Sequence, residues 1–146
     1  MPTWLKLLLG FFAAGALGLA LLVGGGAWWV SKNKDRLTEG GHAAKTEGAA
    51  FGRTHSKNEC IDDGLKHLKD CGPVDFVCEA LTRLRLTSCM SVAKDDGACA
   101  GVPAQAELMK GAFWENAECT RRGYAGSQPC SRLMQGVVLD CGQSKP

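Results

Sequence analysis

Several residue patterns that would indicate an enzyme or a zinc protein are missing from this chain. No two cysteines lie closer than seven positions apart, so there is neither a C-x-x-C redox pair nor the tight cysteine pair of a zinc site. The motifs H-E-x-x-H, G-x-S-x-G, G-x-x-x-x-G-K-[ST] and G-x-G-x-x-G are also absent. We therefore predict no enzyme activity, no metal and no cofactor.

The chain also lacks an excess of either charge. Its formal net charge is +2 over 146 residues, and the basic residues of the C-terminal part are interleaved with acidic ones. A protein that binds nucleic acid usually carries a strongly basic surface. The balance therefore indicates a solvated helical surface and no nucleic-acid partner.

One long apolar run opens the chain, from Trp4 to Val30, with Lys6 as its one charge. About 20 helical residues cross the hydrocarbon core of a bilayer, and tryptophans such as Trp28 and Trp29 favour its interfaces. Residues 1–30 are therefore predicted to be a transmembrane anchor. The alternative is a signal peptide that is cleaved near the small residues 25–27.

The next segment, residues 31–56, is polar and contains several glycines but few apolar side chains. Such a composition cannot build a core of its own. We predict a linker here, helical at most in its first turns, followed by a cysteine-rich helical domain over residues 57–146.

That domain contains eight cysteines, and the same interval of eleven positions separates them four times, from 60 to 71, 78 to 89, 119 to 130 and 130 to 141. Eleven helical residues turn through 1100°, so two such cysteines share one face about 16 Å apart. A disulfide needs Cα atoms within about 7 Å. Each cysteine must therefore bond to another segment, and an antiparallel helix with the same interval offers partners at matching heights.

Two helical hairpins, 57–91 and 104–142, fit this requirement. In the first, Ser56 and Glu59 form a capping box, and Gly72 with Pro73 ends the helix before a second one from about residue 74 to 90. In the second, a helix from about 104 to 122 precedes one from about 129 to 141, which Ser127 caps. The predicted fold class is therefore all-α, a transmembrane helix followed by a small disulfide-stapled bundle of about four helices.

The hairpins favour one disulfide pairing. Folding them places Cys60 opposite Cys89, Cys71 opposite Cys78, and Cys119 near Cys130. Position 108, where a partner for Cys141 would be expected, is leucine, so the nearest candidate for Cys141 is Cys99 in the turn-rich stretch before that helix. Eight cysteines allow 105 pairings. An alternative arrangement, based on a short echo between the residues around Cys60 and Cys119, would link the two halves of the domain by disulfides instead.

A helical hairpin whose helices each carry two cysteines three turns apart resembles the CHCH (twin Cx9C) domains of the mitochondrial intermembrane space. The resemblance covers residues 60–89, where ten residues rather than nine separate the cysteines. It implies a scaffold or assembly role and no catalytic residue. In that family the outer cysteines pair with each other, as do the inner ones.

Cysteine usage also predicts the compartment, because structural disulfides form in oxidising surroundings. We expect a single-pass protein of the bacterial inner membrane with its C-terminal domain in the periplasm. The positive-inside rule, applied to the basic residues at 32, 34 and 36, favours the opposite orientation, but it is a statistical bias. The alternatives are a cleaved, secreted protein or a mitochondrial inner-membrane protein that faces the intermembrane space.

The expected function is structural, as an accessory subunit or scaffold of a membrane or envelope complex. The chain would contact the membrane through its N-terminal run and bind a protein partner, and no small-molecule substrate is evident. Phe113, Trp114 and Tyr124 are candidate partner contacts because large aromatic side chains anchor interfaces well; alternatively, they complete the small core. A different class of function is a redox or metal-handling protein in which some cysteines are free thiols or ligands.

Overall fold

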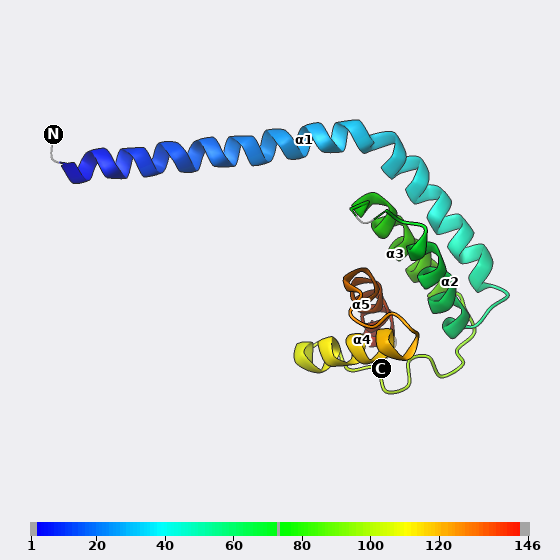
Figure 1. Cartoon of the computed structure of the whole chain (residues 1–146). Coiled ribbons are helices and arrows are strands. Elements are labelled where there is room, and N and C mark those ends of the chain that lie inside the picture. Colours follow the sequence, from blue (N-terminus) through cyan, green and yellow to red (C-terminus); the bar gives the residue numbers. More distant parts are fainter. Residues whose placement is uncertain (1–2, 73, 144–146) are drawn as a thin grey trace. The chain divides into compact units, whose positions relative to one another are not determined.

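The computed structural model describes residues 3–72 and 74–143, with only the backbone at 3, 5–14, 16–17, 19–22 and 143. This part of the chain is all-α and contains five helices and four disulfides. The helices are labelled in Figure 1. The helices are α1 (Thr3–Gly52), α2 (Lys57–Lys69), α3 (Phe76–Met90), α4 (Leu108–Arg121) and α5 (Gln128–Gln143). The predicted all-α class is confirmed.

The chain divides into two compact units, and the boundary between them falls within α1, between Arg36 and Leu37. Along the described residues, no helix contains a stretch that is long and apolar enough to cross a bilayer. Most side chains of the predicted anchor, from Trp4 to Val30, lie outside the part of the chain that the structure describes.

The first hairpin, α2 and α3, begins with the predicted capping box. The Ser56 hydroxyl accepts a hydrogen bond from the Glu59 backbone N–H at 3.4 Å, and the Glu59 carboxylate accepts one from the Ser56 N–H at 2.7 Å. Helix α3 begins at Phe76, two residues later than expected, because the Asp75 carboxylate caps it by accepting from the Cys78 N–H at 3.0 Å. Local side chains therefore determine where both helices start.

The second hairpin, α4 and α5, has a shorter first helix than the sequence suggested. Residues 104–107 form a turn instead of helix, in which the Glu107 N–H bonds to the Ala104 carbonyl at 2.9 Å. Helix α4 then ends before Gly123, whose φ of 84° favours glycine. The expected cap of α5 is present, since the Ser127 hydroxyl accepts from the Cys130 N–H at 3.3 Å.

Four bridges join these elements, and they are the pairs that the hairpin geometry favoured. Their Cα atoms lie 5.8 Å apart in Cys60–Cys89, 5.6 Å in Cys71–Cys78, 5.3 Å in Cys99–Cys141 and 6.0 Å in Cys119–Cys130. These distances lie within the ordinary range for disulfides. The first two bridges hold α2 against α3, whereas the last two hold α5 to α4 and to the loop before α4.

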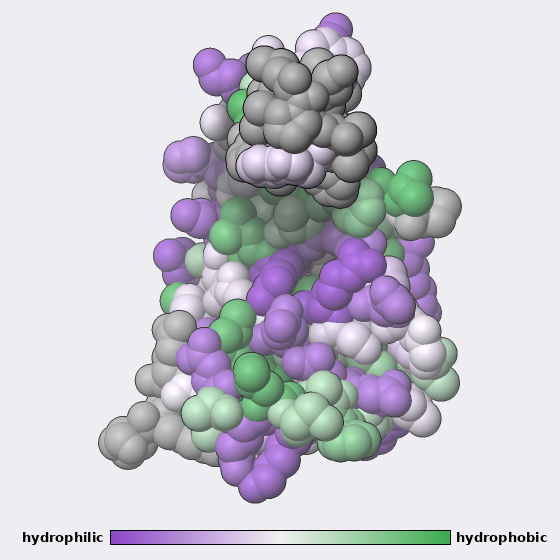
Figure 2. Space-filling view, turned by 90° about the vertical axis from the view of Figure 1, so that its left-hand side faces the viewer, coloured by the Kyte–Doolittle hydropathy of each residue, from purple (hydrophilic) through white to green (hydrophobic). Residues whose placement is uncertain are grey.

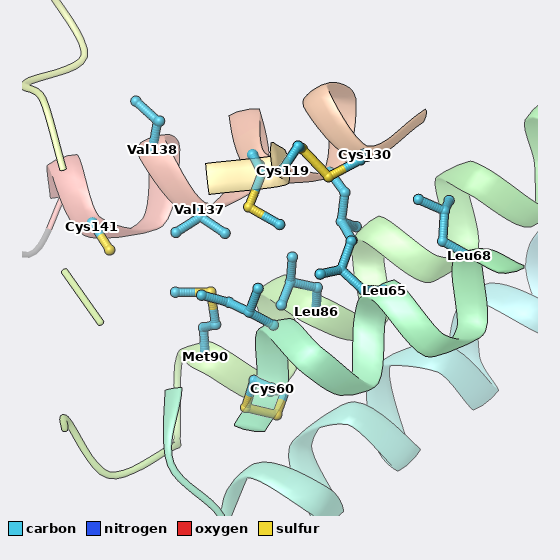
Figure 3. Close-up of a cluster of buried hydrophobic side chains, with 14 of the residues drawn as sticks. Cys60, Leu65, Leu68, Leu86, Met90, Cys119, Cys130, Val137, Val138 and Cys141 are labelled. Atoms are coloured by element: carbon cyan, nitrogen blue, oxygen red, sulfur yellow. A yellow bond between two sulfur atoms is a disulfide. The ribbon is translucent and has the colours of Figure 1, made fainter. Parts of the chain in front are cut away.

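The core lies between α2, α3 and α5 (Figure 3). Its largest fully buried side chains are Ile61 from α2, Leu86 and Met90 from α3, and Met134 and Val137 from α5. Burying each side chain of this kind contributes about 1.5–3 kcal/mol. The apolar stripe of α5 is therefore what brings the two hairpins together.

The segment predicted as a linker differs from that expectation. Residues 31–52 are helical within α1, and from Leu37 they belong to the same unit as the two hairpins. Small residues recur every four positions along this helix, at Gly40, Ala44, Gly48 and Gly52. A methyl group added at Gly48 would overlap the backbone carbonyl of Arg85, and one added at Gly52 would overlap the carbonyl of Cys89.

This row of small residues, the glycine seam, lets α1 lie directly on the backbone of α3. Glycine and alanine permit close helix approach because they have little or no side chain to hold the backbones apart. At the side of the seam, Arg85 forms an ion pair with Glu47 of α1 at 2.5 Å and another with Asp63 of α2 at 2.9 Å. The helical part of the predicted linker thus covers the outer face of the first hairpin.

Candidate interaction surface

The cysteines contribute to the fold and leave no thiol for chemistry. All eight lie in bridges, and none is free. Within residues 3–72 and 74–143, no group of three or more His, Cys, Asp or Glu side chains is placed to hold a metal ion. The side chains that remain available for a function are therefore the exposed ones.

The most exposed large apolar side chains of the second hairpin lie together at the start of α4. Leu108, Met109 and Phe113 are 81%, 74% and 72% exposed, and Ala112 beside them is also exposed. We call these four residues the α4 patch. In Figure 2, hydrophobic side chains gather in the lower part of the face shown, at the height where α4 lies in Figure 1. Grouped apolar exposure of this kind is typical of an interaction surface, whereas scattered apolar residues are not.

The position of Cys119 explains why the patch stays uncovered. Cys119 is fully buried against α5. Phe113 and Met109 precede it by six and ten positions, which places them about 120° and 80° around the helix from it. Leu108 shares the face of Cys119 but lies three turns earlier, at the first residue of the helix. The patch therefore combines the outer face of α4 with an end that the core does not reach.

A groove of about 280 Å³ runs beside the patch between α4 and α5. Leu108, Ala112 and Val138 line it together with Gly111. A methyl group added at Gly111 would meet no atom within 4 Å, so packing inside this chain does not require a glycine there. Glu115 also lines the groove, and burial raises the pKa of its carboxyl although the charge of Arg83 acts in the opposite direction.

The three aromatic residues predicted as partner contacts lie in different surroundings. Phe113 is exposed within the α4 patch, whereas Trp114 and Tyr124 are half-buried and pack against the core. The Tyr124 hydroxyl donates to the Leu65 carbonyl at 3.3 Å, and the Lys69 ammonium lies 5.2 Å from the centre of its ring. Two of the three therefore contribute to the core, and Phe113 is the one that is exposed to solvent.

An ion-pair cluster fixes the other end of α4. The Arg122 side chain, only 8% exposed, bonds to Glu118 at 2.7 Å and to Asn58 of α2 at 2.8 Å, and it also forms an ion pair with Asp62. The hydrogen bonds from Arg121, assisted by Arg122, outweigh the effect of burial and lower the pKa of Glu118 to about 2. These contacts orient α4, and with it the patch, relative to α2.

Sequence analysis identified Phe113 but not Leu108, Met109 or the Arg122 cluster. The positions of Met109 and Phe113 around the helix, relative to Cys119, could have been predicted from their spacing in the sequence. The exposure of Leu108 could not, because it depends on how far α5 extends along α4.

Comparison with known proteins adds no relative: no family model matches the chain, and neither a curated protein nor a solved structure matches it.

Proposed function

We propose that this chain is an interaction protein without enzyme activity, an accessory subunit or scaffold of a membrane or envelope complex, and that it binds its partner through the α4 patch. The observation that carries the proposal is the grouping of Leu108, Met109 and Phe113, each more than 70% exposed, on a domain held by four bridges. Transferring apolar surface from water to a protein contact is favourable by about 25 cal/mol per Å². A rigid domain also loses little conformational freedom when it binds.

The proposal includes an anchor in the membrane, formed by the apolar run from Trp4 to Val30. Its length and its terminal tryptophans support this role. Four disulfides support an oxidising compartment, which for an inner-membrane protein of a bacterium is the periplasm. Protease added to spheroplasts is expected to degrade the helical domain while the membrane is intact, and protection of the domain would contradict this topology.

Site-specific photo-crosslinking tests the interaction. A photoreactive amino acid at position 113 of the full chain, in its own membranes, is expected to give a discrete crosslinked product with a second protein. Position 66, an exposed lysine on α2, is the matched control and is expected to give none. The variant Met109→Ser should weaken the product from position 113. Equal products from positions 113 and 66 would contradict the proposal.

A further inference from the structure

A second hollow lies away from the α4 patch, where the end of α2, the first half of α3 and the start of α5 meet. Its volume is about 300 Å³, which is at the lower end of the range for ligand pockets. Its apolar lining includes Leu68, Phe76 and Leu133, and its charged lining consists of Glu79, Arg83 and Arg132. We call it the arginine cleft.

The apolar part of the cleft is well formed but incompletely covered. Leu68 and Leu133 are 8% and 2% exposed, whereas the ring of Phe76 beside them is 60% exposed. The Cys71–Cys78 bridge holds the turn that leads into Phe76. The ring therefore stands at the edge of the cleft on a fixed element, where an apolar group could pack against it.

The two arginines of the cleft differ in their partners. Arg132 forms an ion pair with Glu79 at 2.7 Å. Among the described residues, no carboxylate lies within 4.0 Å of the Arg83 guanidinium, although this side chain is half-buried. The lining of the cleft thus contains two guanidinium groups and one carboxylate. The charge of Arg83 also acts on Glu115 of α4 from outside the lining, but no direct ion pair with a described residue occupies the Arg83 guanidinium.

Gly136 of α5 lies against the Arg83 side chain. A methyl group added at Gly136 would lie 3.4 Å from Nε and 3.5 Å from Cγ of Arg83, which is ordinary van der Waals contact. The Arg83 side chain therefore lies across α5 at this position.

We propose that the arginine cleft binds a segment of the partner protein in which an acidic residue stands next to a large apolar residue; this inference rests on the proposed function. The carboxylate would accept hydrogen bonds from Arg83, for which the planar guanidinium is well suited. The apolar side chain would pack between Phe76 and Leu133. The start of α5, at Gln128 and Pro129, adds the partial positive charge of a helix N-terminus on the same side.

Two dipeptides that differ by one group test the proposal on the full chain in nanodiscs. Acetyl-Phe-Asp-amide is expected to shift the methyl NMR signals of Leu68 and Leu133 in a saturable way. Acetyl-Phe-Asn-amide, which has the same shape without the charge, should bind about tenfold more weakly, because a charged hydrogen bond is replaced by a neutral one. Equal affinities, the lack of saturable binding, or shifts confined to α4 would each overturn the proposal.

Three variants assign the effect to the cleft. Arg83→Gln should abolish the preference for the aspartyl peptide, whereas Arg53→Gln, an exposed arginine beyond the last residue of α1, should leave it unchanged. Glu79→Gln removes the competing carboxylate and should strengthen binding of the aspartyl peptide roughly threefold. Because this variant is expected to raise the affinity, it still tests the proposal if Arg83→Gln fails to fold. An unchanged affinity in Glu79→Gln would count against the cleft.

The peptide-binding test of the cleft and the crosslinking test of the α4 patch can fail independently of each other. A chain that crosslinks through position 113 but shows no preference between the dipeptides would retain the α4 patch as an interface and reject the cleft. A chain with the preference but without crosslinking would show that the cleft is a peptide site and that α4 is not the docking surface.

Discussion

The two hairpins have the same plan but different outer surfaces. In each, disulfides hold two antiparallel helices together, and in each an interval of eleven residues brings cysteines to one face. On the first hairpin, α1 covers α3 through the glycine seam. On the second, α4 exposes Leu108, Met109 and Phe113. Disulfides alone therefore do not cover the outer face of a hairpin. On the first hairpin a further helix covers it, and for α4 we propose that a partner does so.

The hairpins also differ in how their bridges are distributed. Cys60 of α2 and Cys71 just after α2 both bond to α3, whereas α4 has one cysteine and Cys141 bonds to Cys99 in the preceding loop. Val102 of the same loop is buried in the core at 2% exposure. The second hairpin therefore depends on a loop to complete its packing, which the first does not.

The largest expected effect concerns these bridges. In the chain-entropy account, a disulfide stabilises more when it closes a longer loop. Cys99–Cys141 spans 42 positions and Cys71–Cys78 spans 7. Replacing the first pair by alanine should lower the free energy of unfolding by about 4 kcal/mol, and replacing the second pair by about 2.5 kcal/mol. Urea unfolding measures both, and the reverse order would show that native packing outweighs loop length.

The glycine seam is expected to have the next largest effect. Gly48→Ala should destabilise the fold by about 1–3 kcal/mol, because the added methyl group meets the backbone of Arg85. Gly41→Ala on the same helix is the matched control, since its methyl group would meet only Leu84 Cδ2 at 3.8 Å. That variant should gain roughly 0.5–1 kcal/mol from helix propensity. Thermal unfolding of the two variants should therefore move in opposite directions, and parallel shifts would contradict close packing of α1 on α3.

Acid should weaken the second hairpin through Glu118. Its pKa is about 2 in the folded protein against 4.5 for an unperturbed glutamate. A lowered pKa gives stability that is present above pH 4.5 and is lost as the pH falls toward 2. Between pH 7 and pH 3, the wild type should lose roughly 1–2 kcal/mol more than Glu118→Gln. Urea unfolding at both pH values measures this difference, and equal losses would exclude a contribution from this ion pair.

The smallest effect on stability is expected at the α4 patch. Phe113→Ser should change the free energy of unfolding by less than about 0.5 kcal/mol, because the side chain is 72% exposed. Leu86→Ala in the core is the contrasting variant and should cost about 2–5 kcal/mol. If Phe113→Ser destabilised the domain as much as Leu86→Ala, the patch would be a part of the core and not a surface for a partner.

Much of the fold could be predicted because local signals and the cysteine interval agreed. The capping residues Ser56 and Ser127 act over three positions, so neighbouring residues sufficed to identify them. Three of the four cysteine pairs followed from helix geometry, and Cys99 was the nearest remaining partner for Cys141. The early start assigned to α4 was wrong because Glu107 and Ala104 form a turn, which apolar periodicity does not reveal.

The cover over α3 could not be predicted by the same reasoning. Glycine-rich polar sequence is typical of linkers, and the compositional argument applied to residues 31–56 ignored the spacing of four between the small residues. A seam also depends on the backbone of the opposite helix, which no local pattern in α1 encodes. The arginine cleft was missed for a related reason, because Arg83 and Arg132 are 49 positions apart and become neighbours only when α3 meets α5.

The repeated interval of eleven residues has a consequence for the order of events when the chain matures. Thiols eleven positions apart, such as Cys78 and Cys89 of α3, can easily be joined by a flexible chain because the loop between them is short. A helix that has already formed keeps those two sulfurs about 16 Å apart and so forbids this incorrect crosslink. Helix formation before oxidation therefore favours the native pairing, whereas an oxidant that acts too early would trap mispaired species that are released only by thiol–disulfide exchange.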